Sequence, residues 1–245
     1  MITVVTCLFD GSNFGIPHTT GVYDASWVDK LYRGFKRNST IPFEMVCLVD
    51  RDYNFKEPIR PVKFIEQNNT IAGWSVLLEA YRPDLTNDWR IVVGLDTIIV
   101  NDVDCYLEPD KDFALVRDPY SFEPYVSQFP QFKNEVCNAL SWCSPNSAQI
   151  VWDVWTNQKQ WVYDNCKLPP WDTVSEMVLL RKIFNKKNRV PLLDCIHKGV
   201  YSYRCHILND PKLLQSARIV YFHGDIKPHQ IGKYEFDNQL LKHWK

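Results

Sequence analysis

The chain has 245 residues, of which 45% are apolar and 23% charged, as is ordinary for a soluble globular protein. This length suits one large α/β domain or two small ones. The formal net charge of −1 gives no overall basic field, so we expect neither nucleic acid nor an anionic membrane as a partner.

Strands and helices are predicted to alternate through the first hundred residues. Trp27, Leu31 and Phe35 are spaced by four, which predicts one face of an amphipathic helix. Asp24 and Ser26 offer N-cap oxygens in front of that face. A second helix is predicted over residues 73–83, where a proline ends it. Buried strands are predicted over residues 2–9, 43–50, 61–66 and 89–100.

This alternation predicts βαβ units and a largely parallel sheet, with ligands beyond the carboxyl ends of the strands. The back half is less regular, and we expect one compact domain with a nucleotide-binding front half (1–104) and a more variable back half (105–245). Back-half strands are predicted over 112–120, 138–145 and 217–224, with helices over 148–155, capped by Ser147, and over 173–184.

The eight cysteines contain no CxxC pair and form no regular framework. A chain of this length does not need disulfides, so we expect a reducing, cytoplasmic location. The apolar runs stay well below 18 residues, so no transmembrane segment is expected.

One acid, Asp96, lies inside the apolar stretch GLDTIIV (residues 94–100). A carboxylate in such surroundings is costly unless it is paired, protonated or bound to a cation. At a strand end it could hold Mg²⁺ or Mn²⁺ against a diphosphate. The alternative is an aspartate that caps a turn or bonds the backbone.

The segment HGDIKP (residues 223–228) follows the last predicted strand. His223 could ligate a metal, and Gly224 allows close approach of the backbone to a phosphate. Lys227 offers a point charge for a diphosphate, and Pro228 makes the segment rigid. A solvated basic turn is the alternative interpretation.

Together these two motifs resemble those of GT-A-fold glycosyltransferases that use nucleotide-sugar donors, most closely the glycogenin and galactosyltransferase type of family 8. GLDTIIVNDVD stands in the place of the family's Asp-x-Asp-Thr motif, and HGDIKP matches its closing His-Gly-x-x-Lys-Pro segment. The resemblance implies a single GT-A domain, with a mixed, mainly parallel sheet flanked by helices. It also implies a divalent cation, a UDP-sugar as the first choice of donor, a glycan, protein or small-molecule acceptor, and retention of anomeric configuration.

The resemblance also assigns roles to residues. Asp96 and His223 would be metal ligands, and Glu176 and Asn138 are the candidate catalytic residues. Asp118 and residues 202–204 are candidates for the acceptor side, and a surface charge is an equally good interpretation of Arg204. The predicted donor-binding residues are Thr6, Cys7, Leu8, Tyr23, Asp50, Trp74, Asp96, Thr97, Gly224, Lys227 and Pro228.

Three positions depart from the family pattern. Gly94 stands where the first acid of the Asp-x-Asp motif is expected, Leu77 replaces a lysine, and Met177 replaces a glutamine. These departures leave open a nucleotide-sugar-binding protein with reduced catalysis. A nucleotidyltransferase is a further alternative, but the loop 9–21 lacks the Arg or Lys that such enzymes usually place after the first strand.

Overall fold

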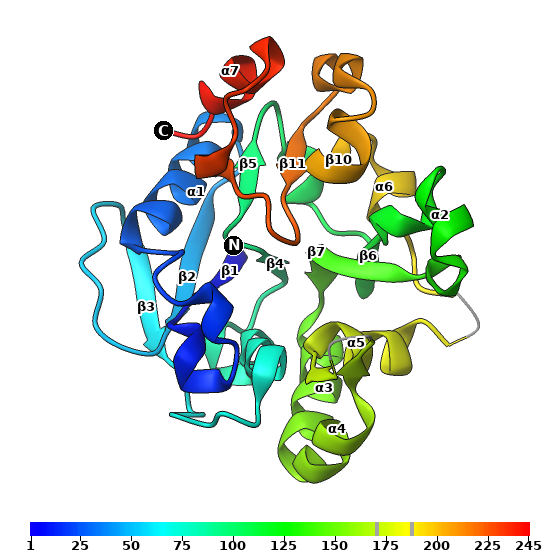
Figure 1. Ribbon diagram of the computed structural model, residues 1–245. Helices are drawn as coiled ribbons and strands as arrows, with labels where there is room; N and C mark the ends of the chain where they lie inside the picture. The colour runs from blue at the N-terminus through cyan, green and yellow to red at the C-terminus, as the bar shows by residue number, and fades with distance from the viewer. Residues whose placement is uncertain (170–171, 187–188) are drawn as a thin grey trace.

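The computed structural model describes residues 1–169, 172–186 and 189–245, and its centre is a six-stranded sheet (Figure 1). Four neighbouring strands are parallel, and the last two run antiparallel to their neighbours. The mixed, mainly parallel sheet expected from the sequence is therefore confirmed. In spatial order the strands are β3 (Ile59–Lys63), β2 (Phe43–Val49), β1 (Ile2–Leu8), β4 (Arg90–Val93), β7 (Val136–Cys143) and β6 (Phe113–Arg117).

A smaller sheet lies beside the central one and contains β10 (Val200–Ser202), β11 (Ile219–Tyr221) and β5 (Thr97–Ile99). Strand β11 is parallel to β10 and antiparallel to β5. The predicted strand 89–100 is thus two strands, one in each sheet, with the acidic motif between them. Strands β8 (Lys167–Leu168) and β9 (Thr173–Val174) form a separate antiparallel pair.

Helices cover both faces of the central sheet, with α1 on one side and α3 to α5 gathered on the other (Figure 1). Among the described residues, no helix has the length and apolar character needed to cross a membrane. The helices are α1 (Ala25–Arg37), α2 (Tyr125–Gln128), α3 (Pro145–Asn157), α4 (Lys159–Asn165), α5 (Glu176–Phe184), α6 (Leu193–Ile196) and α7 (Glu235–Leu241).

Helix α1 begins as its sequence predicts. The Asp24 carboxylate accepts a hydrogen bond from the Ser26 amide at 2.8 Å, which satisfies one of the free donors at the helix start. Trp27, Leu31 and Phe35 are buried against the sheet.

Two predicted elements differ in detail. The stretch 73–83 forms a 3-10 helix, η3 (Gly73–Tyr81), rather than an α-helix, and most of its residues are buried. The third strand lies two residues earlier than expected. Its Pro61 is tolerated because β3 is an edge strand, whose one partner among the described strands is β2.

The cap of α3 also differs from expectation. The Ser144 hydroxyl accepts the hydrogen bond from the Ser147 amide at 3.2 Å, so Ser144 rather than Ser147 is the N-cap. Pro145 occupies the first helical position, where its missing N–H costs nothing. The helix therefore starts at Pro145, three residues before the predicted start at residue 148.

Arg90, at the start of β4, is fully buried and fixes η3 and the following turn to the sheet. Its Nη1 donates to the carbonyls of Ala80 (3.1 Å) and Arg82 (2.8 Å), and Nη2 donates to the Thr86 carbonyl at 3.2 Å. Buried carbonyls need partners, so this side chain satisfies the backbone of a connector that leads directly to β4.

We predict that Arg90→Met lowers the free energy of unfolding by about 2–4 kcal/mol, because it leaves buried carbonyls without donors. Urea unfolding measures the change. The control, Lys111→Met, removes an exposed charge and should change the free energy of unfolding by less than about 0.5 kcal/mol. Equal effects of the two substitutions would contradict the structural role of Arg90.

Candidate functional site

Asp96 lies where the chain leaves the central sheet and enters the smaller one. It follows the carboxyl end of β4 by three residues, and its carbonyl accepts a hydrogen bond from the Phe222 amide at 2.8 Å. Strand β5 then pairs antiparallel with β11, with Thr97 opposite Tyr221. This pairing brings the acidic motif next to the start of HGDIKP, as the two-motif prediction requires.

The Asp96 carboxylate is held by two side chains from distant parts of the chain. Lys227 Nζ lies 2.5 Å from Oδ2, and the Tyr23 hydroxyl donates to the same oxygen at 3.2 Å. Burial and the nearby Asp96 charge raise the pKa of Tyr23, so its hydroxyl stays protonated and remains a donor. Lys227 also lies over the Tyr23 ring, 5.7 Å from the centroid.

The loop after β11 has a fixed shape. Gly224 has a φ of +66°, a left-handed conformation that favours glycine. Lys227 is held by a hydrogen bond from its amide to Gln230 Oε1 at 2.8 Å, and the buried Pro228 begins a short 3-10 turn. In Figure 1 this orange loop descends from β11 toward the middle of the molecule. The ammonium group is thus presented from a rigid turn.

His223 is partly buried at the end of β11, with its Nε2 2.8 Å from the Ser202 hydroxyl. Cys205 Sγ lies 3.6 Å from the same nitrogen, and the Tyr120 ring meets the imidazole edge-on with centroids 5.4 Å apart. Burial, and then the positive charge of Arg204, lower the pKa of His223 to about 4. The imidazole is therefore neutral near pH 7, which is the form that ligates metals.

Glu176 and Asn138, the predicted catalytic pair, are in direct contact. Asn138 Nδ2 donates to Glu176 Oε1, and burial raises the pKa of Glu176 to about 7. Asn138 belongs to β7, where the Ala139 carbonyl accepts from the Gly94 amide at 3.4 Å. Since Ala139 lies opposite Gly94, the preceding residue, Asn138, lies on the side of the acidic motif.

The predicted nucleoside-binding residues lie at the carboxyl ends of β1 and β2. Thr6 donates to the Val93 carbonyl at 2.9 Å, and Leu8 is in the core, so of the first three only Cys7 is partly exposed. Asp50 is committed to structure. It accepts from the Asp10 amide, Asn13 Nδ2 and the Tyr53 hydroxyl, each at 3.0 Å.

Two other predicted residues have local partners. The Trp74 ring packs against Phe9 and His18, with centroids 6.5 and 6.0 Å away, at the carboxyl end of β1. Asp118 forms an ion pair with Arg181 at 2.6 Å, which indicates a structural role. The roles of Trp74 and of the nucleoside-site residues in donor binding stay predictions.

The environment of His223 contains residues that the sequence did not connect to it. The family resemblance places Ser202 on the acceptor side and assigns no role to Cys205 or Tyr120. These residues come from segments remote in sequence, and only the parallel pairing of β10 with β11 places Ser202 beside Tyr221 and His223. The spacing of motifs within one sequence does not predict which distant segments come into contact.

The donor atoms here fit a divalent cation in part. Asp96 supplies a carboxylate and His223 a neutral imidazole, and Thr97 Oγ1 is buried with no hydrogen-bond partner among the described residues. Within the described part of the chain, no group of three or more His, Cys, Asp or Glu is placed to hold a metal. Gly94 explains the shortage, because its missing side chain would begin 3.1 Å from Asp96 Oδ1. A cation would need further oxygens from its ligand or from water.

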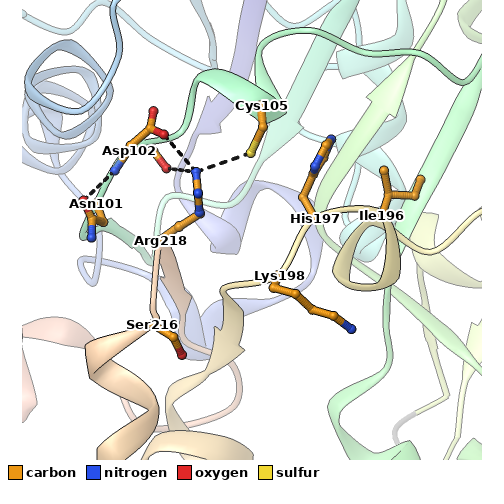
Figure 2. A pocket seen from close by; sticks show the side chains of 8 residues that line it. All are labelled: Asn101, Asp102, Cys105, Ile196, His197, Lys198, Ser216 and Arg218. Carbon is orange, nitrogen blue, oxygen red and sulfur yellow. Dashed lines mark hydrogen bonds and ion pairs between the residues drawn. The ribbon is translucent and has the colours of Figure 1, made fainter.

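A cavity of about 490 Å³ lies at the opposite end of β5 and β11 (Figure 2). In it Arg218 Nη1 donates to the Asp102 carbonyl at 2.8 Å and lies 3.5 Å from Cys105 Sγ. The cavity is therefore separate from the Asp96 and His223 group. Its lining residues are Asn101, Asp102, Cys105, Ile196, His197, Lys198, Ser216 and Arg218.

Solved structures share this fold at low sequence identity. The galactosyltransferase LgtC, crystallised with donor and acceptor sugar analogues, has a TM-score of 0.61 and 10% identity over 99% of this chain and 96% of its own. The glycosyltransferase GlyE of Streptococcus pneumoniae TIGR4 has a TM-score of 0.60 and 13% identity over 98% of this chain, which spans 59% of GlyE.

The bifunctional glycosyltransferase WbbM gives a TM-score of 0.55 at 12% identity over 99% of this chain, which spans 51% of WbbM. No protein-family profile and no curated protein sequence matches the chain. These structural likenesses confirm the predicted GT-A fold, because each covers nearly the whole chain.

The raised pKa of Glu176 predicts a pH dependence of stability. Its value of about 7 in the folded protein exceeds the usual 4.5, so the folded state binds the proton more tightly than the unfolded state does. The contribution of Glu176 to the free energy of unfolding therefore falls as pH rises from about 4.5 to about 7.

We compare the free energy of unfolding of Glu176→Gln with that of the unchanged protein. We expect this difference to shift in favour of the variant by about 1–3 kcal/mol between pH 4.5 and pH 8. Urea unfolding at the two pH values measures this difference. Glu108→Gln, at an exposed position, is the control and should show no such difference. A pH-independent effect of Glu176→Gln would refute the burial argument.

Proposed function

We propose that this protein transfers a sugar from a nucleotide diphosphate sugar, with UDP-sugars as the first choice, to an acceptor hydroxyl. The contact between Lys227 and Asp96 carries the proposal, because it joins residues 131 positions apart at the carboxyl edge of the parallel strands. Ligands of open α/β sheets bind at this edge. The fold shared with LgtC, GlyE and WbbM supports the same chemistry.

The reaction needs positive charge where the diphosphate leaves. Lys227 can exchange Asp96 for a phosphate oxygen, since its ammonium group projects from a fixed turn and is only partly exposed. A cation in such a low-dielectric site stabilises developing negative charge far more than it would in water. This neutralisation is the main catalytic contribution that we assign to the loop.

Asp96 and the neutral His223 would hold a divalent cation, Mn²⁺ or Mg²⁺. When bound, this ion supplies Lewis-acid neutralisation of the diphosphate. Tyr23 keeps the Asp96 carboxylate oriented through its hydroxyl, and Ser202 orients the imidazole. Both contacts restrict side chains that would otherwise rotate, which is the usual task of groups that support a metal ligand.

Glu176 and Asn138 form the part of the site proposed to face the transferred sugar. Above about pH 7 the Glu176 carboxylate is ionised, and the Asn138 amide fixes its direction. A fixed negative charge stabilises the positive charge that develops at the anomeric carbon. With retention, the acceptor hydroxyl attacks on the face that the diphosphate leaves, and a departing phosphate oxygen accepts the hydroxyl proton.

Reduced catalysis is the second candidate function, and Gly94 is the observation that favours it. With a single carboxylate between β4 and β5, the protein could bind a nucleotide sugar without turning it over. Met177, next to Glu176, is only partly buried against the core cluster and offers no amide to the sugar. Turnover measurements separate this candidate from the transferase.

We expect the purified protein to hydrolyse a UDP- or GDP-sugar slowly in the presence of Mn²⁺, releasing the nucleoside diphosphate. Asp96→Ala and His223→Ala should each lower this rate by about a hundredfold or more, because each removes a cation ligand. Coupled detection of free nucleoside diphosphate gives the rate.

The exposed substitution Lys198→Met should leave the hydrolysis rate unchanged. Binding of a nucleotide sugar without turnover, with or without an acceptor, would support the second candidate instead. Release of pyrophosphate from a nucleoside triphosphate supplied with a sugar 1-phosphate, without release of a nucleoside diphosphate from a nucleotide sugar, would indicate a nucleotidyltransferase.

Gly94→Asp should strengthen Mn²⁺ binding about tenfold, because it adds a second carboxylate beside Asp96 and affinity rises with ligand charge. The backbone at this position tolerates a side chain, since the nearest contact of an added Cβ is the movable Asp96 Oδ1 at 3.1 Å. The concentration of Mn²⁺ that half-activates hydrolysis measures the affinity. Gly94→Asn, of equal size but uncharged, is the matched control, and identical values for both substitutions would count against the two-carboxylate explanation.

A further inference from the structure

Arg204 lies in a short helical turn (Tyr203–Ile207) that follows β10. The turn is tied down on both sides. The Ser202 hydroxyl accepts from the Cys205 amide at 3.0 Å, and the buried Tyr203 donates to Asp237 Oδ1 at 2.7 Å. The Tyr203 ring also stacks on Phe222, with centroids 4.7 Å apart. The backbone of Arg204 is therefore fixed relative to the end of β11.

The guanidinium group of Arg204 lies against the loop that carries Lys227. A Cβ placed on Gly224 would meet Arg204 Nη1 at 3.0 Å, so the guanidinium nitrogen occupies the space directly beside this glycine. Within the described residues, no hydrogen bond or ion pair to the Arg204 guanidinium forms. A partly buried arginine without an acceptor is unusual, because desolvating a charge is costly unless a partner compensates it.

Two cations, Lys227 and Arg204, thus lie at the loop after β11. Among the described residues, only one of them has an anionic partner. Lys227 is paired with Asp96, whereas Arg204 is free to bind an anion. Arg204 acts on its surroundings, since after burial its charge is the largest cause of the lowered pKa of His223. The positive potential at Gly224 is therefore stronger than the motif HGDIKP alone would produce.

We propose that Arg204 binds the diphosphate of the nucleotide directly, together with Lys227 and the backbone at Gly224. This inference rests on the proposed function and names a binding residue outside both motifs. The guanidinium group is planar and can donate two parallel hydrogen bonds to one phosphate, which an ammonium group cannot. Because Gly94 supplies no carboxylate, the site would bind a metal ion more weakly. A second cation beside Gly224 would supply part of the positive charge that the diphosphate needs.

The test compares ligands that differ only in phosphate. We expect Arg204→Met to weaken UDP binding about tenfold to a hundredfold, as measured by calorimetry, because charge-assisted hydrogen bonds to phosphate are lost. Uridine binding should be unchanged. Arg204→Lys should recover part of the loss, since the charge returns without the paired geometry.

Lys198→Met is the matched control, because it removes one positive charge at the opposite end of β10. It should not change the binding of UDP or of uridine. If Arg204→Met leaves UDP binding intact while Lys227→Met weakens it, the inference about Arg204 is wrong and the proposed function stands. An equal loss of uridine and UDP binding by Arg204→Met would also overturn it, since that pattern indicates a structural role. If the unchanged protein binds neither UDP, GDP nor their sugars, the proposed function itself fails and this inference with it.

Discussion

The antiparallel pairing of β5 with β11 is the constraint on which the candidate site depends. It is a short pairing, Thr97 to Ile99 against Ile219 to Tyr221, yet it brings Asp96 next to the segment that carries His223 and Lys227. Because Asp96 precedes one strand and His223 follows the other, both emerge at the same end of the small sheet. The parallel partner β10 adds Ser202 at that end, and Arg204 follows it.

Burial shifts the pKa values of two ionisable side chains of the proposed site in opposite directions. It raises the pKa of Glu176 to about 7 and lowers that of His223 to about 4, so near neutral pH the imidazole is uncharged and the carboxylate is close to its midpoint. Asp96 has its charge balanced by Lys227 instead. Arg204 is therefore the cation of the site without an anionic partner among the described residues, and a diphosphate would find it beside Lys227, which is already largely buried on its turn.

The sequence predicted what local pattern can encode. Strand positions, the Asp24 cap and the two motifs follow from periodicity, capping chemistry and the cost of a carboxylate in an apolar stretch. The change of sheet between β4 and β5 could not be predicted, because each short strand is equally apolar and only its partners decide the sheet. For the same reason the contacts of Ser202, Cys205 and Arg204 were missed, since they depend on which distant strands pair.

The long separation of the two motifs has a thermodynamic consequence. In the unfolded chain, Asp96 and Lys227 are 131 positions apart, so no ligand can engage both. Any molecule that bridges them in the folded protein binds that state alone and must raise the melting temperature, by an amount set by its concentration relative to its dissociation constant. Thermal stability is thus an assay for ligands that bind the folded protein, and it requires no knowledge of the acceptor.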